Sequence, residues 1–148
     1  MYQHILIPTD GSEIAEKAVA AGIEYAREAN AKVTLFTAVP EYQLPSEGEV
    51  LTRRPVTSMA DHARNSEKKA KGILANAARQ ARAAGLAFHT DFVQSNHPWQ
   101  AIIDAAERHR CDAIFMASHG RRGLAAVFHG SETREVLTHS RIPTMVYR

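Results

Sequence analysis

Residues 112–137, DAIFMASHGRRGLAAVFHGSETREVL, hold a strand, a loop and the beginning of a helix. The apolar run over 112–118 is typical of a buried strand, and SETREVLTHS, residues 131–140, has the character of a helix. The loop between them carries glycines, two adjacent arginines and two histidines. Such a loop is either a glycine turn before a capped helix or a cradle for a phosphate, and its own spacing leaves both interpretations open.

The same succession of strand and helix continues through the rest of the chain. Short apolar or β-rich runs predict strands over residues 2–8, 32–39, 86–94, 112–118 and 142–148. Helical spacing and start signals predict helices over residues 12–30, 58–84, 98–110 and 131–140. Ser12 is the expected N-cap of the first helix, and Asn30 is its expected stop signal. Residues 40–57 lack periodicity and are expected to form a long loop.

This alternation, with nearly continuous apolar strands, predicts an α/β fold in which helices cover both faces of a parallel sheet. The length of 148 residues suits one domain, spanning 1–148. Ligands of such sheets bind beyond the carboxyl ends of the strands, where the strand order reverses. If the loops after strands 1 and 4 form one site, these strands are neighbours. That condition selects the Rossmann-like order 3-2-1-4-5 over the order 2-1-3-4-5.

Composition and charge exclude several other classes of protein. Eighteen lysines and arginines against sixteen aspartates and glutamates give a net charge of +2, too small for a general nucleic-acid-binding or membrane-binding surface. No apolar stretch approaches the roughly 20 residues that cross a bilayer, and the first residues do not resemble a signal peptide, so we expect a cytoplasmic protein. The single cysteine, Cys111, has no disulfide partner, and the eight histidines show no ligand spacing for a metal.

Two loops contain the candidate binding residues. In PTDGS, residues 8–12, Asp10 either orders the turn or accepts hydrogen bonds from a ribose or adenine group, and its position leaves both roles open. After strand 4, Gly130 and Ser131 stand directly before a helix, whose free N–H groups favour an anion. The Ser131 hydroxyl can cap that helix, donate to a phosphate oxygen, or do both.

The chain resembles the universal stress protein family along its whole length. The resemblance rests on ILIPTDGSEIAEKAV near the start, VTLFTAV in strand 2 and residues 112–148 at the end. Nucleotide-binding members of that family carry the pattern G-x2-G-x9-G-[ST]. Here Gly120, the nine residues that follow it, Gly130 and Ser131 match the pattern, while Ala117 stands in place of its first glycine.

The resemblance implies a binding site for ATP or another adenine nucleotide, which Mg²⁺ can accompany. Pro8, Thr9 and Asp10 would lie near adenine and ribose, and Ala38 would contact adenine through its backbone. The ribose and phosphates would be surrounded by residues that end strand 4, follow it, or begin the last helix: Met116, Ala117, Ser118, His119, Gly120, Arg121, Gly130, Ser131, Glu132 and Thr133.

The resemblance further implies a stress-response protein with the nucleotide as a regulatory ligand, and a homodimer whose last strands pair across a two-fold axis. The apolar TMVYR at the end suits such an edge strand. The alternative is a nucleotide-free dimeric interaction protein of the same fold. Efficient ATP hydrolysis is not indicated and no catalytic residue is assigned. A Ser118–His119–Asp10 triad is disfavoured because adjacent side chains at a strand end point in opposite directions. A third alternative is an enzyme of the wider adenine-nucleotide α-hydrolase-like superfamily, but the S-G-G-x-D-S phosphate loop expected of such an enzyme does not follow strand 1.

Overall fold

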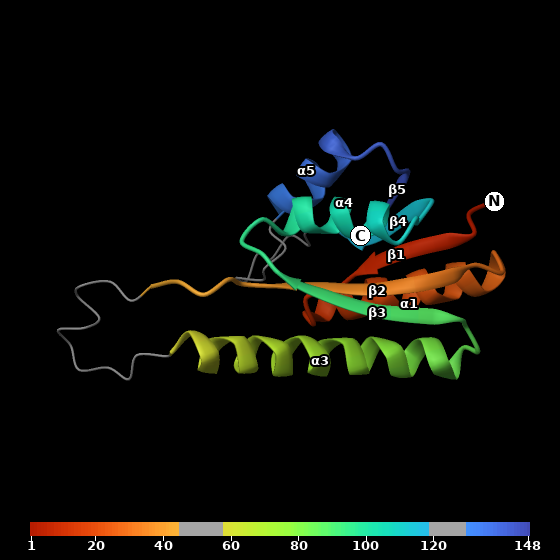
Figure 1. Ribbon diagram of the computed structural model, residues 1–148. Helices are drawn as coiled ribbons and strands as arrows, with labels where there is room; N and C mark the ends of the chain where they lie inside the picture. Colours follow the sequence, from red (N-terminus) through yellow and green to blue (C-terminus); the bar gives the residue numbers. More distant parts are fainter. Residues whose placement is uncertain (45–57, 119–129) are drawn as a thin grey trace.

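The structure, a computed structural model, describes residues 1–44, 58–118 and 130–148, in which strands and helices alternate (Figure 1). The strands are β1 (His4–Pro8), β2 (Lys32–Val39), β3 (Phe88–Gln94), β4 (Ala113–Ala117) and β5 (Thr144–Tyr147). The helices are α1 (Glu13–Glu28), α3 (Met59–Ala83), α4 (Pro98–Arg108) and α5 (Gly130–His139). Each element begins and ends within two residues of its predicted bounds.

The strands form one parallel sheet in the order β3-β2-β1-β4-β5. β1 lies at its centre, and its register with β4 aligns Ile5 with Ala113 and Leu6 with Ile114. The predicted α/β class and strand order are therefore confirmed. Because β1 and β4 are parallel neighbours, the loops that follow them leave the same edge of the sheet.

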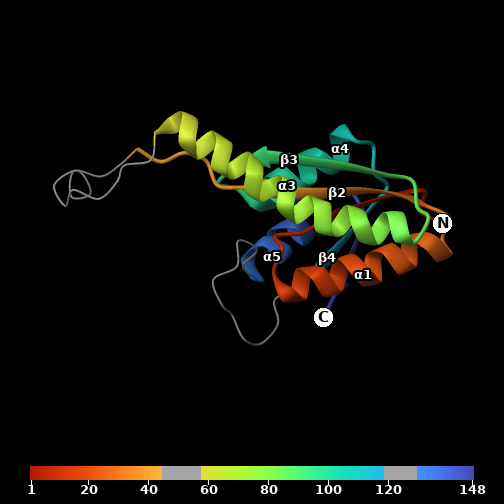
Figure 2. The ribbon, with the colours of Figure 1, turned by 90° about the horizontal axis from the view of Figure 1, so that it is seen from below.

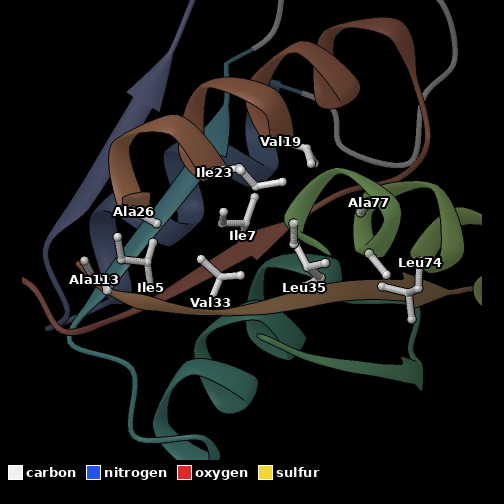
Figure 3. Packing of buried hydrophobic residues seen from close by; sticks show 13 residues of the cluster. Ile5, Ile7, Val19, Ile23, Ala26, Val33, Leu35, Leu74, Ala77 and Ala113 are labelled. Atoms are coloured by element: carbon white, nitrogen blue, oxygen red, sulfur yellow. The ribbon is translucent and has the colours of Figure 1, made fainter. Parts of the chain in front are cut away.

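Helices cover both faces of this sheet. α1 and α3 lie side by side on one face in Figure 2, and α4 and α5 lie on the other face. β1 is buried at each of its five residues, and β2 is buried at every residue after Lys32, which explains their continuous apolar sequence. Buried apolar side chains pack between the sheet and the helices α1 and α3 (Figure 3). They include Ile5, Ile7, Val33, Leu35 and Ala113 of the sheet and Val19, Ile23, Ala26, Leu74 and Ala77 of the helices.

The helix boundaries follow from local signals in the sequence. The Ser12 hydroxyl accepts a hydrogen bond from the Ala15 N–H at 3.3 Å, which confirms Ser12 as the N-cap of α1. Asn30 has a φ of 53°, the left-handed conformation that commonly follows a helix. Pro98 is the first residue of α4, where the absence of its N–H removes no intrahelical hydrogen bond.

The backbone groups of the edge strand β3 alternate between its two sides. The Val33 N–H donates to the Ala87 carbonyl at 3.0 Å, and the Ser95 N–H donates to the Val39 carbonyl at 2.8 Å. In both bonds an odd-numbered residue of this segment directs its backbone group toward β2. Along a strand of a parallel sheet, residues bonded to a given neighbour alternate with residues whose N–H and C=O point to the opposite side. The N–H and C=O groups that lie along the outer edge of the sheet are consequently those of Phe88, Thr90, Phe92 and Gln94.

Gly22 allows α1 to approach the sheet closely. A Cβ atom at this position would lie 2.9 Å from Ile7 Cδ1 and 3.0 Å from Phe115 Cδ1. Ile7 is fully buried, and the Phe115 ring packs against the Tyr25 ring with 6.2 Å between centroids. A larger residue at position 22 must therefore displace side chains that are themselves held by packing.

We expect Gly22→Ala to lower the free energy of unfolding by about 1 kcal/mol, because overpacking costs about 1–3 kcal/mol and the gain in helix propensity, about 1 kcal/mol, offsets only part of that cost. The matched control is Gly72→Ala at an exposed position of α3, where an added Cβ would meet no atom of the described residues within 4 Å. It should raise the free energy of unfolding by about 0.5–1 kcal/mol. Urea denaturation measures both changes, and a stabilised Gly22→Ala would contradict the tight contact.

His4 is a buried histidine at the start of the central strand. It is 6% exposed, and its Nε2 lies 2.8 Å from the Thr34 hydroxyl oxygen. Burial lowers the pKa of His4, and the positive charges of Lys32, His109 and His89 lower it further, while Asp112 acts in the opposite direction. The folded protein therefore favours neutral His4.

The nearby thiol of Cys111 is also buried. Its burial raises the pKa of Cys111 to about 11, although a hydrogen bond with Thr34 acts in the opposite direction. At neutral pH the sulfur is therefore a thiol rather than a reactive thiolate.

The lowered pKa of His4 predicts a loss of stability in mild acid. Below about pH 6.5 the unfolded chain binds a proton at this histidine more readily than the folded chain does, so the free energy of unfolding falls as the pH falls. His4→Gln keeps a hydrogen-bonding partner for Thr34 but does not titrate. In urea denaturation between about pH 7.5 and 5.5, this variant should lose less stability than the parent protein. His97→Gln, at an exposed position, is the control, and equal losses in the parent and His4→Gln would refute the assignment.

Candidate functional site

The turn after β1, residues 8–12, is a compact structure at the carboxyl edge of the sheet. Thr9 is fully buried, its N–H donates to the Phe36 carbonyl at 2.8 Å, and its hydroxyl oxygen accepts from the Gly11 N–H at 3.2 Å. Asp10 Oδ1 accepts from the Ser12 N–H at 2.9 Å. Asp10 therefore orders the turn, one of its two expected roles, and its half-buried carboxylate remains at the edge where a ligand would lie.

A main-chain donor and acceptor belong to the segment of β2 that extends past β1. The paired residues of β1 and β2 end at Pro8 and Phe36. Phe36 directs its carbonyl toward β1, where it accepts from Thr9, so the alternation of the ladder directs the N–H and C=O of Ala38 to the same side. At that level β1 has already turned away into residues 9–12. Ala38 thus presents one donor and one acceptor to the space beyond the end of β1.

Thr37, next to Ala38, carries a polar atom that sequence reasoning did not single out. Its hydroxyl oxygen is fully buried and has no hydrogen-bond partner among the described residues. Buried polar groups of folded proteins are nearly always paired, so an unpaired hydroxyl next to a candidate site indicates a place for a water molecule or a ligand. No feature of the sequence distinguishes this threonine from the buried Thr34.

The end of β4 and the beginning of α5 form the other wall of the site. Met116 is 2% exposed, Ala117 and Ser118 are half-buried, and the Ser118 N–H donates to the Tyr147 carbonyl at 2.6 Å. The hydroxyl of buried Thr133 donates to the Ala117 carbonyl at 3.0 Å. This hydrogen bond holds the first turn of α5 against the end of β4, so the free N–H groups of the helix start lie at the same edge.

Glu132, expected to lie near the phosphates, makes a contact that the sequence did not predict. Its Oε2 accepts from the Trp99 N–H at 2.7 Å, which places a carboxylate at the N-terminus of α4. A negative charge there interacts favourably with the helix dipole and satisfies a free N–H group. The Trp99 ring also stacks on His139, with 4.8 Å between ring centroids. Glu132 therefore fastens α5 to α4.

The expected phosphate-binding residues lie partly outside the described residues. His119, Gly120 and Arg121 belong to residues 119–129, which the structure does not describe. Gly130 and Ser131 are the first two residues of α5, so both lie inside the helix that they were expected to precede, and Ser131 is not its N-cap. The described residues thus bring together Pro8, Thr9, Asp10, Ala38, Met116, Ala117, Ser118 and Thr133 at one edge of the sheet.

The described residues place polar side-chain and main-chain groups at this edge. Within residues 1–44, 58–118 and 130–148, no three histidine, cysteine, aspartate or glutamate side chains are arranged to hold a metal ion. Nor does any helix of this part combine the length and apolar character needed to span a membrane. What the edge offers is a carboxylate at Asp10, main-chain groups at Ala38 and the start of α5 near Ala117.

Solved structures with the same fold include proteins bound to nucleotides. The structure of MJ0577 from Methanocaldococcus jannaschii superposes with a TM-score of 0.76 at 27% identity, covering 99% of this chain and 95% of that one. A universal stress protein in complex with cAMP superposes with a TM-score of 0.70 at 23% identity, covering 99% and 97%. Two further structures, a complex with dAMP from Archaeoglobus fulgidus and one with AMP from Arabidopsis thaliana, share 19% and 16% identity at TM-scores of 0.67 and 0.66.

Sequence comparison leads to the same family. The universal stress protein MJ0531 of Methanocaldococcus jannaschii is 28% identical to this chain and aligns with all of it and with 83% of its own length. MJ0577 is 26% identical and aligns with all of this chain and 96% of its own length. The sequence pattern of the universal stress protein family matches residues 1–148. The chain belongs to the universal stress protein family.

Proposed function

We propose that this protein binds an adenine nucleotide as a regulatory ligand at the edge formed by β1, β2, β4 and α5. The observation that carries the proposal is the main-chain N–H and C=O of Ala38, which have no hydrogen-bond partner among the described residues and lie at the same edge of the sheet as the turn that contains Asp10. Solved structures of the same fold that hold cAMP, dAMP or AMP support it, because these ligands share adenine, a sugar and one phosphate. A stress response in the cytoplasm is the setting that we propose from the family.

The main-chain groups of Ala38 suit one edge of adenine. Adenine carries an amino group that donates and a ring nitrogen next to it that accepts. An N–H and a C=O from one residue can therefore bind this pair, with the carbonyl on the amino group and the N–H on the ring nitrogen. Inosine reverses the pattern, because its carbonyl replaces the amino group and its ring nitrogen carries a proton.

Ala117 is compatible with a phosphate close to the backbone. Of the described residues other than glycine, only Asn30 and Arg110 have a positive φ, so the backbone at position 117 is not left-handed. An alanine there consequently carries none of the strain that would make glycine necessary. The start of α5, held to Ala117 by Thr133, supplies N–H groups and a favourable dipole for the phosphates. ATP, accompanied by Mg²⁺, is the form that we propose first.

We propose binding rather than rapid turnover. Hydrolysis needs a general base within hydrogen-bond reach of the attacking water. Asp10 orders the turn after β1, and one carboxylate oxygen of Glu132 is engaged at the start of α4. Both carboxylates thus have structural partners, which favours a regulatory role for the nucleotide.

The proposal predicts selectivity for adenine over hypoxanthine. Calorimetric titration should give a dissociation constant for IMP about tenfold or more above that for AMP, because two hydrogen bonds of about 1 kcal/mol each are lost and the Ala38 groups are left unpaired. In the same titrations Asp10→Asn should weaken AMP binding about tenfold, because we assign the second carboxylate oxygen of Asp10 as the acceptor for a ribose hydroxyl. The Asn side chain can still order the turn, so its unfolding temperature is the control. Equal affinities for AMP and IMP, or no binding of either, would contradict the proposal.

We further propose that the protein is a homodimer through β5. The Ile114 N–H donates to the Pro143 carbonyl at 2.9 Å and the Ser118 N–H donates to the Tyr147 carbonyl at 2.6 Å. Odd-numbered residues therefore face β4, and the N–H and C=O of Val146 lie along the outer edge. An edge strand with free groups can pair with its copy across a two-fold axis.

Val146→Pro tests the homodimer because it removes an outward N–H without removing a hydrogen bond to β4. Light scattering at high micromolar concentration should give about twice the chain mass for the parent and the mass of one chain for the variant. Thr90→Pro, which removes an outward N–H from the opposite edge of the sheet, is the control and should remain dimeric. A parent protein that stays monomeric would refute the proposal.

A further inference from the structure

α3 and the edge strand β3, which lie next to each other in Figure 1, line an open groove of about 400 Å³. Its apolar surface comes from Leu74 and Ala78 of α3 and from Phe88 and Phe92 of β3, which share one core cluster. Both phenylalanines are only partly buried. Part of the apolar surface of this cluster therefore remains open to a partner.

The outer edge of β3 adds backbone hydrogen-bonding groups to this groove. The N–H and C=O groups of Phe88, Thr90 and Phe92 point away from β2, and the side chains of the same residues line the groove. An extended segment placed beside β3 would therefore form main-chain hydrogen bonds and insert alternate side chains next to α3. This arrangement is the one that proteins use when a peptide is added to a sheet as a further strand.

The charges along α3 indicate the composition of such a peptide. The helix carries six basic and two acidic residues: Arg64, Lys68, Lys69, Lys71, Arg79 and Arg82 against Asp61 and Glu67. Lys71 and Arg82 line the groove, about 16 Å apart along the helix axis at about 1.5 Å per residue. Lys71 pairs with exposed Glu67, whereas Arg82 lies over the Phe88 ring at 5.5 Å and forms no ion pair among the described residues. Acidic residues at the ends of a peptide would meet these two cations.

A carboxylate of the groove itself does not cancel this charge. Asp91 lines the groove, but its Oδ2 is engaged by His109 Nε2 at 2.7 Å and by Arg108. A second copy of β3 fits less well as the occupant. In a two-fold pair of β3 strands the two α3 helices would lie on the same face of the joined sheet, and two helices with an excess of basic residues would repel each other.

We propose that the groove between α3 and β3 binds an extended acidic–apolar peptide segment of a partner protein, which adds to the sheet as a strand beside β3. Its side chains that face α3 are apolar at the centre, against Phe88 and Phe92, and acidic at the two ends, against Arg82 and Lys71. This function is independent of nucleotide binding, so either can fail without the other.

The probe is a fluorescently labelled peptide with the sequence Glu-Thr-Val-Thr-Val-Thr-Glu, whose alternate residues reproduce this pattern. Its control is the same peptide with lysine in place of both glutamates. We expect fluorescence anisotropy with the full chain to show saturable binding of the acidic peptide, at least about fivefold tighter than binding of the lysine peptide. Thr90→Pro should abolish this binding because it removes an outward N–H, whereas Val146→Pro, on the opposite edge, should not change it.

A charge reversal separates loss of the site from loss of the fold. The double variant Lys71→Glu and Arg82→Glu should prefer the lysine peptide by about the factor by which the parent prefers the acidic one. Circular dichroism of each variant verifies that it is folded.

Three results would overturn the proposal. The first is the absence of saturable binding at about 1 mM peptide. The second is binding that neither Thr90→Pro nor the charge reversal alters, since the peptide would then bind elsewhere. The third is a Val146→Pro protein whose mass still doubles as its concentration rises, together with a Val146→Pro, Thr90→Pro double variant that stays monomeric. That result would show that a second copy of the chain occupies the edge of β3.

Discussion

The pairing of β1 with β2 on one side and β4 on the other is the constraint on which the rest of the structure depends. β1 is buried at all five residues, and both of its edges are used by neighbours. Asp112 strengthens this arrangement, because its carboxylate, just before β4, accepts from the backbone N–H groups of Gln3 and His4 at the start of β1. Burial alone would raise the pKa of Asp112, but these hydrogen bonds outweigh it and lower the pKa. The turn that contains Asp10 lies next to the end of β4 only because β1 and β4 are neighbours in the sheet.

Much of this arrangement could be predicted from the sequence, because it depends on local signals. Apolar runs, Ser12 as an N-cap and Pro98 as a helix start indicate the elements, and two polar loops indicate the strand order. The contact of Glu132 with Trp99 and that of Thr133 with Ala117 could not be predicted in the same way. They join residues of different elements, and their formation depends on where packing sets one helix against another. The side to which the backbone groups of Ala38 point likewise depends on the register between β1 and β2. The sequence does not decide between two registers that differ by one residue.

The alternation of hydrogen-bonded residues in a parallel sheet leaves unpaired backbone groups at three places in this protein. Since bonded residues alternate along a strand, each strand directs half of its backbone groups to either side. Where β2 extends past β1, the backbone groups of Ala38 consequently point into the space beyond the end of β1, where we propose that the nucleotide binds. On β3 and β5 it leaves a row of groups at each outer edge of the sheet, where soluble proteins generally need a cover or a partner. In this universal stress protein the sheet itself, as well as the loops, therefore supplies the groups on which the proposed binding depends.

The central place of β1 has a consequence for the order in which the chain can fold. The contact of Gln3 with Asp112 joins residues 109 positions apart, and β1 is synthesised well before β4. While the ribosome is still producing the middle of the chain, β1 and β2 can pair, but the other edge of β1 has no neighbour. Contacts of such long range slow folding and leave an apolar strand accessible to other molecules for a time. During synthesis the fully buried strand β1 therefore lacks one of its two neighbours until β4 emerges.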